Sequence, residues 1–395
     1  MLKYALLLIV LVLGSCAQPP DDDDFEWDPP VGAVLNEAVV RIPTEVPPVV
    51  TMEVTLMHPD GAGPFPLAVV NHGADGINDD HRGHRYHRTN AAFYFLSRGY
   101  AVAMPMMRGF STTGGELYHF GCDITATGLA NARDIASVIR YLGNDPRFDT
   151  RRVIVAGQSL GGWNTLAVGA LGLPNVVGLV NFNGGMKESD CATGDASLQS
   201  GAANFGARTK IPSIWFYGDN DEIFPRTIWR SMVDDYTGAG GRAEIVDVGT
   251  TMGDSHFFLA YPEVLPIWTT VLDRFLAQVD MPHTDIHPND LPTQFPSSTQ
   301  FAAVGNVDAV PYLSDNGRDL YRNFLTLSPP RVFAIAPNGF ATSTDGGLDP
   351  IGRALAACRD AGTVCRIYAV DDRVVWTLPG VRAEAKTTNR RLGPP

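Results

Sequence analysis

Short apolar runs alternate with amphipathic stretches along the chain from about residue 36 to residue 280. The runs are bounded by glycine, proline or aspartate, which is typical of strands buried on both faces of a sheet. We predict strands at Val50–Met57, Leu67–Asn71, Tyr100–Met104, Val153–Ala156, Val176–Phe182, Ile214–Tyr217 and Ala243–Val248. Apolar residues at helical spacing predict helices at Asn90–Ser97, Ile124–Leu142, Leu160–Leu171, Ile228–Tyr236 and Leu265–Val279. This alternation indicates an α/β fold with a doubly wound, mostly parallel sheet.

The predicted α/β unit occupies residues 35–281, and a linker containing several prolines follows at 282–297. Residues 298–377 show a shorter mixture of helical and strand patterns, so we expect a small α+β accessory unit there. A tail follows at 378–395. Within the main unit, residues 183–210 are rich in small and polar residues. We expect them to form a loop-rich segment rather than a large apolar lid, because they show little apolar periodicity.

The N-terminal segment, residues 1–15, is typical of a secretory signal peptide, in which a positive charge precedes an apolar run. Cys16 follows Leu-Gly-Ser, and this sequence resembles the lipobox of bacterial lipoproteins, whose cysteine receives a lipid. Residues 16–34 hold a run of aspartates and several prolines, typical of a solvated tether. We therefore expect an exported protein anchored in the cell envelope, at the outer membrane because Ala17 rather than aspartate follows. The alternative is an ordinary secretory signal with a coincidental cysteine.

Acidic side chains outnumber basic ones by 43 to 30, which gives a formal net charge of −13. This balance argues against nucleic acid as a partner, because such binding depends on basic surfaces. No apolar run approaches the ~18 residues of a spanning helix. Contact with a membrane is therefore expected only through the lipid anchor.

Export would place the remaining cysteines in an oxidising compartment, where an even number favours disulfides. Apart from Cys16 the sequence has Cys122, Cys191, Cys358 and Cys365. We favour the pairs Cys358–Cys365, which are close in sequence, and Cys122–Cys191 within the main unit. The other connectivities, and buried free thiols, are alternatives.

The strongest chemical motif is Gly-Gln-Ser-Leu-Gly at residues 157–161, between a predicted strand and a predicted helix. A nucleophilic serine on a sharp strand-to-helix turn needs small neighbours, because the backbones pass close to each other. The helix N-terminus then points N–H groups at a developing oxyanion. The context therefore predicts Ser159 as a nucleophile.

Chain order supports this interpretation, because such a serine is followed by an acid and then a histidine, each after a later strand. Asp219, Asp221 and Glu222 follow one predicted strand, and His256 follows the next. We predict His256 as the general base that takes the serine proton. All three carboxylates are candidates for the acid.

An oxyanion hole needs a second N–H group from the loop after an earlier strand. The sequence His72-Gly73-Ala74 follows the predicted strand Leu67–Asn71. We predict that the backbone N–H groups of Ala74 and Leu160 form the hole. His72 is expected to shape the loop through hydrogen bonds rather than to act as a catalyst.

These motifs resemble the α/β-hydrolase superfamily, specifically its dienelactone-hydrolase-like and prolyl-oligopeptidase-like branch, over about residues 35–280. Arg108-Gly109 and Gly114-Gly115 resemble a loop that follows the fourth strand in that branch. The resemblance implies Asp221 as the acid, because related sheets place it three residues after the glycine that ends the strand. Asp219 would then bond local backbone N–H groups of the turn.

The nucleophile refines the expected activity, because dienelactone hydrolases use cysteine whereas this chain has Ser159. The resemblance therefore implies a serine hydrolase that cleaves carboxylic esters, small or polymeric, through an acyl-enzyme and without cofactor or metal. A serine peptidase or amidase is the second hypothesis; peptide-cleaving relatives carry a propeller ahead of the hydrolase domain, and here only a short tether precedes it. The third is a non-catalytic envelope lipoprotein with a binding role.

Histidines and arginines alternate in a loop between two predicted elements, at His81, Arg82, His84, Arg85, His87 and Arg88. Histidines three residues apart suit a metal site on a helix, but Gly83 and the arginines disfavour both the helix and a bound cation. We expect a positively charged loop near the mouth of the active site that attracts carboxylate-bearing substrates.

Overall fold

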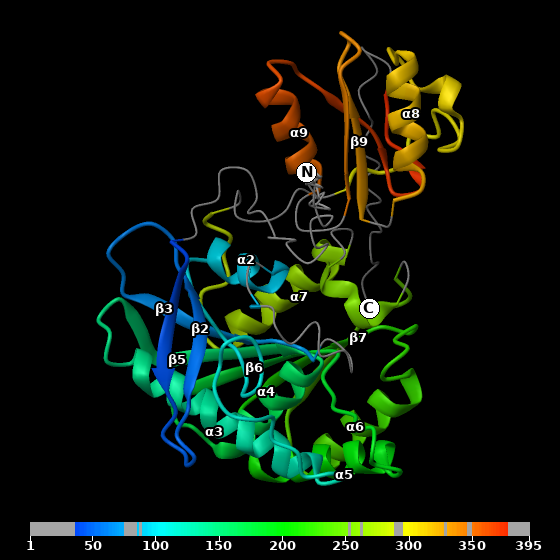
Figure 1. Ribbon diagram of the computed structural model, residues 1–395. Coiled ribbons are helices and arrows are strands. Elements are labelled where there is room, and N and C mark those ends of the chain that lie inside the picture. Colours follow the sequence, from blue (N-terminus) through cyan, green and yellow to red (C-terminus); the bar gives the residue numbers. More distant parts are fainter. Residues whose placement is uncertain are drawn as a thin grey trace, which may run out of the picture.

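A computed structural model of the chain describes most residues between 36 and 377 (Figure 1). The described ranges are 36–74, 85–86, 89–251, 254–260, 264–287, 295–327, 330–345 and 350–377. The predicted signal peptide, Cys16, the tether and the tail lie outside them, as do His81, His84 and His87. Among the described residues, no helix combines the length and apolar character needed to cross a membrane.

The main unit is built on an eight-stranded sheet with the order β1-β2-β4-β3-β5-β6-β7-β8. Its strands are β1 (Ala38–Pro43), β2 (Thr51–Met57), β3 (Phe65–Asn71), β4 (Ala101–Pro105), β5 (Phe148–Gln158), β6 (Val176–Phe182), β7 (Ser213–Tyr217) and β8 (Ala243–Asp247). Strand β2 is antiparallel to both β1 and β4, and the remaining neighbours are parallel. The carboxyl ends of the parallel strands therefore lie at one edge, where active sites of such sheets form.

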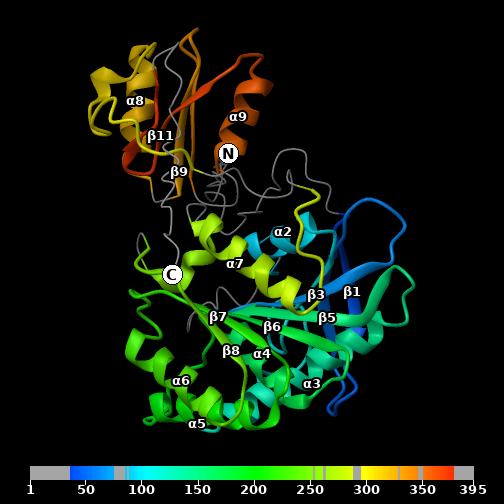
Figure 2. The ribbon, with the colours of Figure 1, turned by 180° about the vertical axis from the view of Figure 1, so that it is seen from behind.

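Helices cover both faces of this sheet (Figures 1 and 2). They are α2 (Asn90–Ser97), α3 (Ile124–Leu142), α4 (Leu160–Leu171), α5 (Gly194–Arg208), α6 (Arg226–Gly238) and α7 (Leu265–Gln278), with a short 3₁₀ helix η1 (Ser255–Ala260). In β5, Val153 and Val155 pack into the core beneath α3 and α4, while Ile154 and Ala156 pack beneath α2 and α7. Because both faces are covered, the strand is a continuous apolar run.

Helix α5 corrects the expectation of a loop-rich segment at residues 183–210. Its buried side chains include Leu198, Ala202 and Phe205, which share one helical face at spacings of four and three. Glycine, alanine and serine fill most other positions and obscure this pattern. The segment thus begins as a loop after β6 and continues as a helix that packs against α6 and α4.

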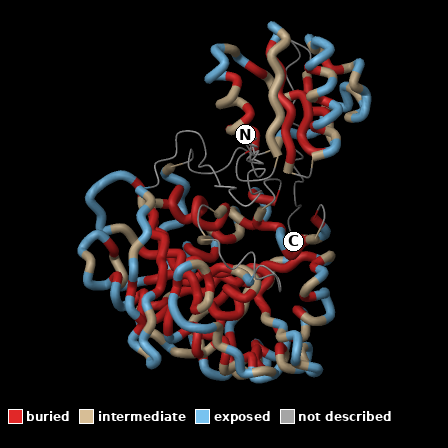
Figure 3. Tube along the Cα trace, in the orientation of Figure 1, coloured by how far each residue is buried: buried red, intermediate tan, exposed pale blue. Residues whose placement is uncertain are grey.

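The second unit is a four-stranded antiparallel sheet with the order β10-β9-β11-β12. Its elements are η4 (Val307–Ala309), α8 (Asp315–Phe324), β9 (Arg331–Ile335), β10 (Ala341–Asp345), α9 (Pro350–Asp360), β11 (Arg366–Val370) and β12 (Arg373–Val374). Helix α8 covers one face of this sheet and α9 the other, so each unit has its own buried interior (Figure 3). The sequence pattern did not predict β10, because Ala-Thr-Ser-Thr-Asp is a polar, half-buried edge strand.

Two disulfides join the cysteine pairs that the sequence favoured. The Cys122–Cys191 bond links the residue before the N-cap of α3 to the loop that precedes α5. The Cys358–Cys365 bond links α9 to the residue before β11. Each bond therefore lies within one unit.

Candidate active site

Ser159 lies on a sharp turn between the end of β5 and the start of α4. Its backbone has φ 53° and ψ −122°, a conformation that non-glycine residues rarely adopt. Only glycine fits on either side of this turn, because a side chain there would clash with the backbone. A Cβ on Gly157 would lie 2.2 Å from the carbonyl oxygen of Gly161, and a Cβ on Gly161 would lie 2.1 Å from the carbonyl oxygen of Asn71. The close backbone packing at this turn thus explains the glycines of the Gly-x-Ser-x-Gly pattern.

The turn is fixed to its surroundings through the backbone of Ser159. Its N–H donates to the carbonyl of Phe182 at 3.0 Å, and its carbonyl accepts from the N–H groups of Trp163 and Gly185 at 3.0 and 3.1 Å. Phe182 and Gly185 belong to β6 and the loop that follows it. Three backbone hydrogen bonds therefore hold the turn in place, and Ser159 itself is half-buried.

Asp221 is buried in the loop after β7, with 3% of its surface exposed. Its carboxylate accepts hydrogen bonds from the N–H groups of Ile223 and Phe224 at 2.9 and 2.8 Å, and from Nδ2 of Asn183 at 2.8 Å. Both carboxylate oxygens lie 3.1 Å from Nδ1 of His256. The structure thus brings Asp221 and His256 together and holds the carboxylate in a fixed orientation.

His256 is equally well anchored. Its N–H donates to the carboxylate of Asp254 at 2.8 Å, and its carbonyl accepts from Nε2 of Gln158 at 2.9 Å. Because Asp221 engages Nδ1, the other ring nitrogen, Nε2, is the one that could exchange a proton with a further group. Gln158 immediately precedes Ser159, so the segments that carry Ser159 and His256 are joined by this hydrogen bond.

Two of these positioning residues were not found from the sequence. Asn183 is buried at the end of β6 with φ 48°, and Gln158 occupies the variable position of the serine motif. Asn183 directly follows β6, at the edge of the sheet where the carboxyl ends of the parallel strands lie, and this position could have marked it as a site residue. Its contact with Asp221, however, depends on the tertiary fold.

Asp219 takes a different role from the one expected. Its carboxylate forms an ion pair with Arg226, the first residue of α6, rather than bonding the N–H groups of its own turn. Arg226 is shared with Asp247 at 2.8 Å. The side chain of Asp219 is 37% exposed, whereas that of Asp221 is fully covered. The two neighbouring aspartates thus face a surface cation and a buried imidazole, respectively.

The loop after β3 passes close to Ser159. A Cβ built on Gly73 would lie 3.3 Å from Cβ and 3.9 Å from Oγ of Ser159, and Ala74 follows. Leu160 is the first residue of α4, so its N–H has no acceptor within the helix. Both predicted oxyanion residues therefore belong to segments that adjoin Ser159.

His72 is buried and bonded on both sides of its ring. Its Nδ1 lies 2.7 Å from the carbonyl of Gly73, and its Nε2 accepts from the N–H of Met107 at 2.9 Å. The ring also packs edge-on against Phe110. These contacts match a residue that holds the loop in shape.

Arg108 and Arg85 are engaged in ion pairs. Arg108 is buried and donates to both oxygens of Asp134 on α3 at 2.6 and 2.9 Å, and this hydrogen bonding raises the pKa of the guanidinium. Arg85 pairs with Glu37 at 2.6 Å. Arg85 is thus held by a carboxylate of its own chain, while Arg82 and Arg88 lie outside the described residues.

Residues 86–174 match the model of the prolyl oligopeptidase family, a segment that contains the Ser159 turn but neither Asp221 nor His256. The strand order and the strained serine turn agree with this match. The main unit has the α/β-hydrolase fold. Within this α/β-hydrolase unit, the strand-turn-helix setting of Ser159 is that of a serine hydrolase.

Several solved structures are similar to the α/β-hydrolase unit. A dienelactone hydrolase of Klebsiella pneumoniae subsp. pneumoniae, assigned as such only provisionally, is 18% identical with a TM-score of 0.44, covering 63% of this chain and 99% of its own. Est1E of Butyrivibrio proteoclasticus, solved with ferulic acid, is 15% identical with a TM-score of 0.44, covering 61% and 99%. The acylaminoacyl peptidase of Pyrococcus horikoshii is 16% identical with a TM-score of 0.43, covering 58% and 39%. No curated protein sequence matches this chain.

Proposed function

We propose that this protein is a serine hydrolase that cleaves carboxylic esters through an acyl-enzyme. The observation that carries the proposal is the buried Asp221–His256 pair, tied through Gln158 to the strained turn that presents Ser159. Buried charged groups are costly unless they are paired, so such a pair, linked to the turn of a half-buried serine, favours a catalytic purpose.

In the proposed reaction, Oγ of Ser159 attacks the ester carbonyl while Nε2 of His256 takes the hydroxyl proton. The N–H groups of Ala74 and Leu160 stabilise the oxyanion of the tetrahedral intermediate. His256 then gives its proton to the departing alcohol, which leaves the acyl group on Ser159. A water molecule, deprotonated by His256, attacks the acyl-enzyme and releases the acid, and the proton returns to Ser159.

Amide or peptide cleavage by the same residues is the second candidate. The match of residues 86–174 to the prolyl oligopeptidase family favours it, because that segment contains the nucleophile. The two activities differ in the leaving group, since an amine must be protonated before it departs.

The experiment compares matched p-nitrophenyl esters and p-nitroanilides with the full chain and with Ser159→Ala. We expect ester hydrolysis that exceeds amide hydrolysis and disappears in the variant. Stronger amide cleavage would select the peptidase alternative. No turnover of either series by folded protein would contradict catalysis and favour a binding lipoprotein.

We also propose export and anchoring through a lipid on Cys16, which rests on the sequence alone. Cys16→Ser should move the protein from the membrane fraction to the soluble fraction of the cell envelope. Unchanged fractionation would contradict the anchor without affecting the catalytic proposal.

A further inference from the structure

The loop from the end of β6 to Cys191 is anchored to the active site at its first residues. Gly185 donates its N–H to the carbonyl of Ser159 at 3.1 Å, and a Cβ on Gly185 would lie 2.5 Å from the ring of Phe224. The hydroxyl of Tyr217 donates to the carbonyl of Gly184 at 2.6 Å, and burial raises the pKa of this phenol far above its usual range. The start of the loop therefore has a fixed position beside the nucleophile.

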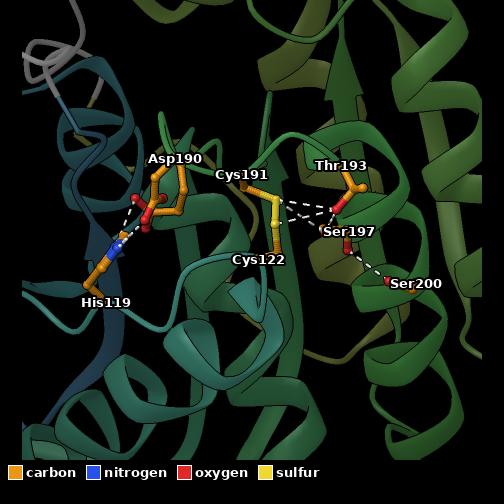
Figure 4. The surroundings of a disulfide bond; sticks show 8 residues. His119, Cys122, Asp190, Cys191, Thr193, Ser197 and Ser200 are labelled. Carbon is orange, nitrogen blue, oxygen red and sulfur yellow. Dashed lines mark hydrogen bonds and ion pairs between the residues drawn. A yellow bond between two sulfur atoms is a disulfide. The ribbon is translucent and has the colours of Figure 1, made fainter.

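The same loop is fixed at its other end by a covalent bond and an ionic contact (Figure 4). Cys191 is bonded to Cys122. Three residues before Cys122, His119 lies between two acidic side chains of the loop: Nδ1 is 3.2 Å from Glu188 and Nε2 is 3.0 Å from Asp190. The imidazole of His119 thus contacts both Glu188 and Asp190, the two acidic residues that follow Lys187 in the loop.

Lys187 lies between these anchors and is exposed. Its ammonium nitrogen is 5.7 Å from the ring centre of Phe224, within the range of a cation–π contact. The Phe224 ring in turn packs against the imidazole of His256, with 5.5 Å between ring centres. Among the residues that the structure describes, no carboxylate forms an ion pair with Lys187, because its acidic neighbours in the loop face His119.

We infer that Lys187 is a specificity-determining residue that binds a negatively charged group, such as a carboxylate, on the ester substrate. The inference rests on the proposed function and adds a substrate class to it. A chain with a net charge of −13 repels anions in general. Lys187, which pairs with no carboxylate among the described residues, contacts the Phe224 ring that packs against His256, so its charge gives local attraction where the substrate must bind. In the proposed reaction His256 protonates the departing alcohol. Phe224 contacts both His256 and Lys187, so we expect the substrate's negative charge on the alcohol portion of the ester.

The test measures kcat/KM for pairs of esters that differ by one carboxylate. Benzyl acetate and the acetate ester of 4-(hydroxymethyl)benzoic acid place the charge on the alcohol, and methyl pentanoate and monomethyl adipate place it on the acid. The variants are Lys187→Gln, Lys187→Arg and, as a matched control, Lys210→Gln, an exposed lysine that follows the C-cap of α5. We expect Lys187→Gln to lower the anionic-to-neutral ratio for the alcohol pair about tenfold, and Lys187→Arg to keep most of it.

His119→Gln provides a second, independent variant. It removes the imidazole that contacts Asp190, and this carboxylate can then pair with Lys187, so the same ratio should fall in the same direction by a smaller factor. Added salt should reduce the ratio in the wild type, because the contact lies near the surface.

A ratio that is the same in Lys187→Gln and the wild type for both ester pairs would overturn the inference while leaving ester hydrolysis intact. A change confined to the acyl pair would support recognition by Lys187 and overturn its assignment to the alcohol side. Failure of the wild type to cleave even the neutral esters would instead overturn the proposed function itself.

Discussion

Both units of this chain bury charged side chains, but these side chains face different partners. In the α/β-hydrolase unit, Asp221 faces His256, and the backbone of His256 is tied to the turn that carries a half-buried serine. In the small unit, Asp371 is 1% exposed and accepts from the N–H of Arg331 at 2.9 Å. The Arg331 guanidinium in turn donates to backbone carbonyls of its own unit, such as that of Leu327 at 2.6 Å.

The partner of a buried charged group separates a role in stability from a role in catalysis. Buried polar groups that form hydrogen bonds with the backbone of their own unit stabilise its fold and leave no reactive atom exposed. A buried acid that orients a histidine, whose backbone is linked to the turn of a half-buried serine, instead favours proton transfer. We therefore expect substitutions in the first unit to change rates, and comparable substitutions in the second to change stability.

The largest effect is expected for Ser159→Ala. Removal of the nucleophile should lower kcat for ester hydrolysis by on the order of 10⁴-fold or more, because no other group can form the acyl-enzyme. The free energy of unfolding should change by less than about 1 kcal/mol, since only a half-buried hydroxyl is lost. Rates and urea denaturation of the same preparations check both parts, and appreciable residual activity would contradict the role of Ser159.

Two aspartates in the loop after β7, Asp219 and Asp221, should differ strongly in their effect on the rate. Asp221→Asn should lower kcat about 10³- to 10⁴-fold, because an amide no longer orients and stabilises the protonated imidazole. Asp219→Asn should lower it less than about threefold, because this carboxylate pairs with a surface arginine. Steady-state kinetics of both variants decide the assignment, and equal losses would show that the acid has been misassigned.

The two disulfides differ in the length of chain that they close, 69 against 7 residues of separation. On loop entropy, replacing Cys122 and Cys191 by alanine should destabilise the main unit by about 4 kcal/mol, and replacing Cys358 and Cys365 the small unit by about 2.5 kcal/mol. Hydrogen exchange followed by mass spectrometry separates the units. The reverse order would indicate that native packing, rather than loop length, dominates.

The smallest effect concerns the buried aspartate of the second unit. Asp371→Ala should destabilise this unit by about 1 to 3 kcal/mol, because the N–H of Arg331 loses its acceptor. Ester hydrolysis should stay within about twofold of the wild type. A large loss of activity with the small unit still folded would show that the two units act together.

Features set by local sequence could be predicted, and features set by tertiary contact could not. The strand β5, the Ser159 turn and helix α4 are adjacent in the chain, so apolar pattern and glycine spacing predicted them together. Helix α5 was missed because its small residues dilute the apolar face, and β10 because an edge strand needs little apolar surface. The partners of Asp221 and Asp219, namely Asn183 and Arg226, depend on how distant segments meet.

The most direct measurement is the reaction of the full chain with a fluorophosphonate, followed by mass mapping of the adduct. We predict one adduct, on Ser159, which is lost in His256→Ala because the hydroxyl is no longer deprotonated on attack. Labelling should persist in Asp371→Ala. An adduct elsewhere, or none on folded wild-type protein, would contradict the claim that Ser159 is an activated nucleophile.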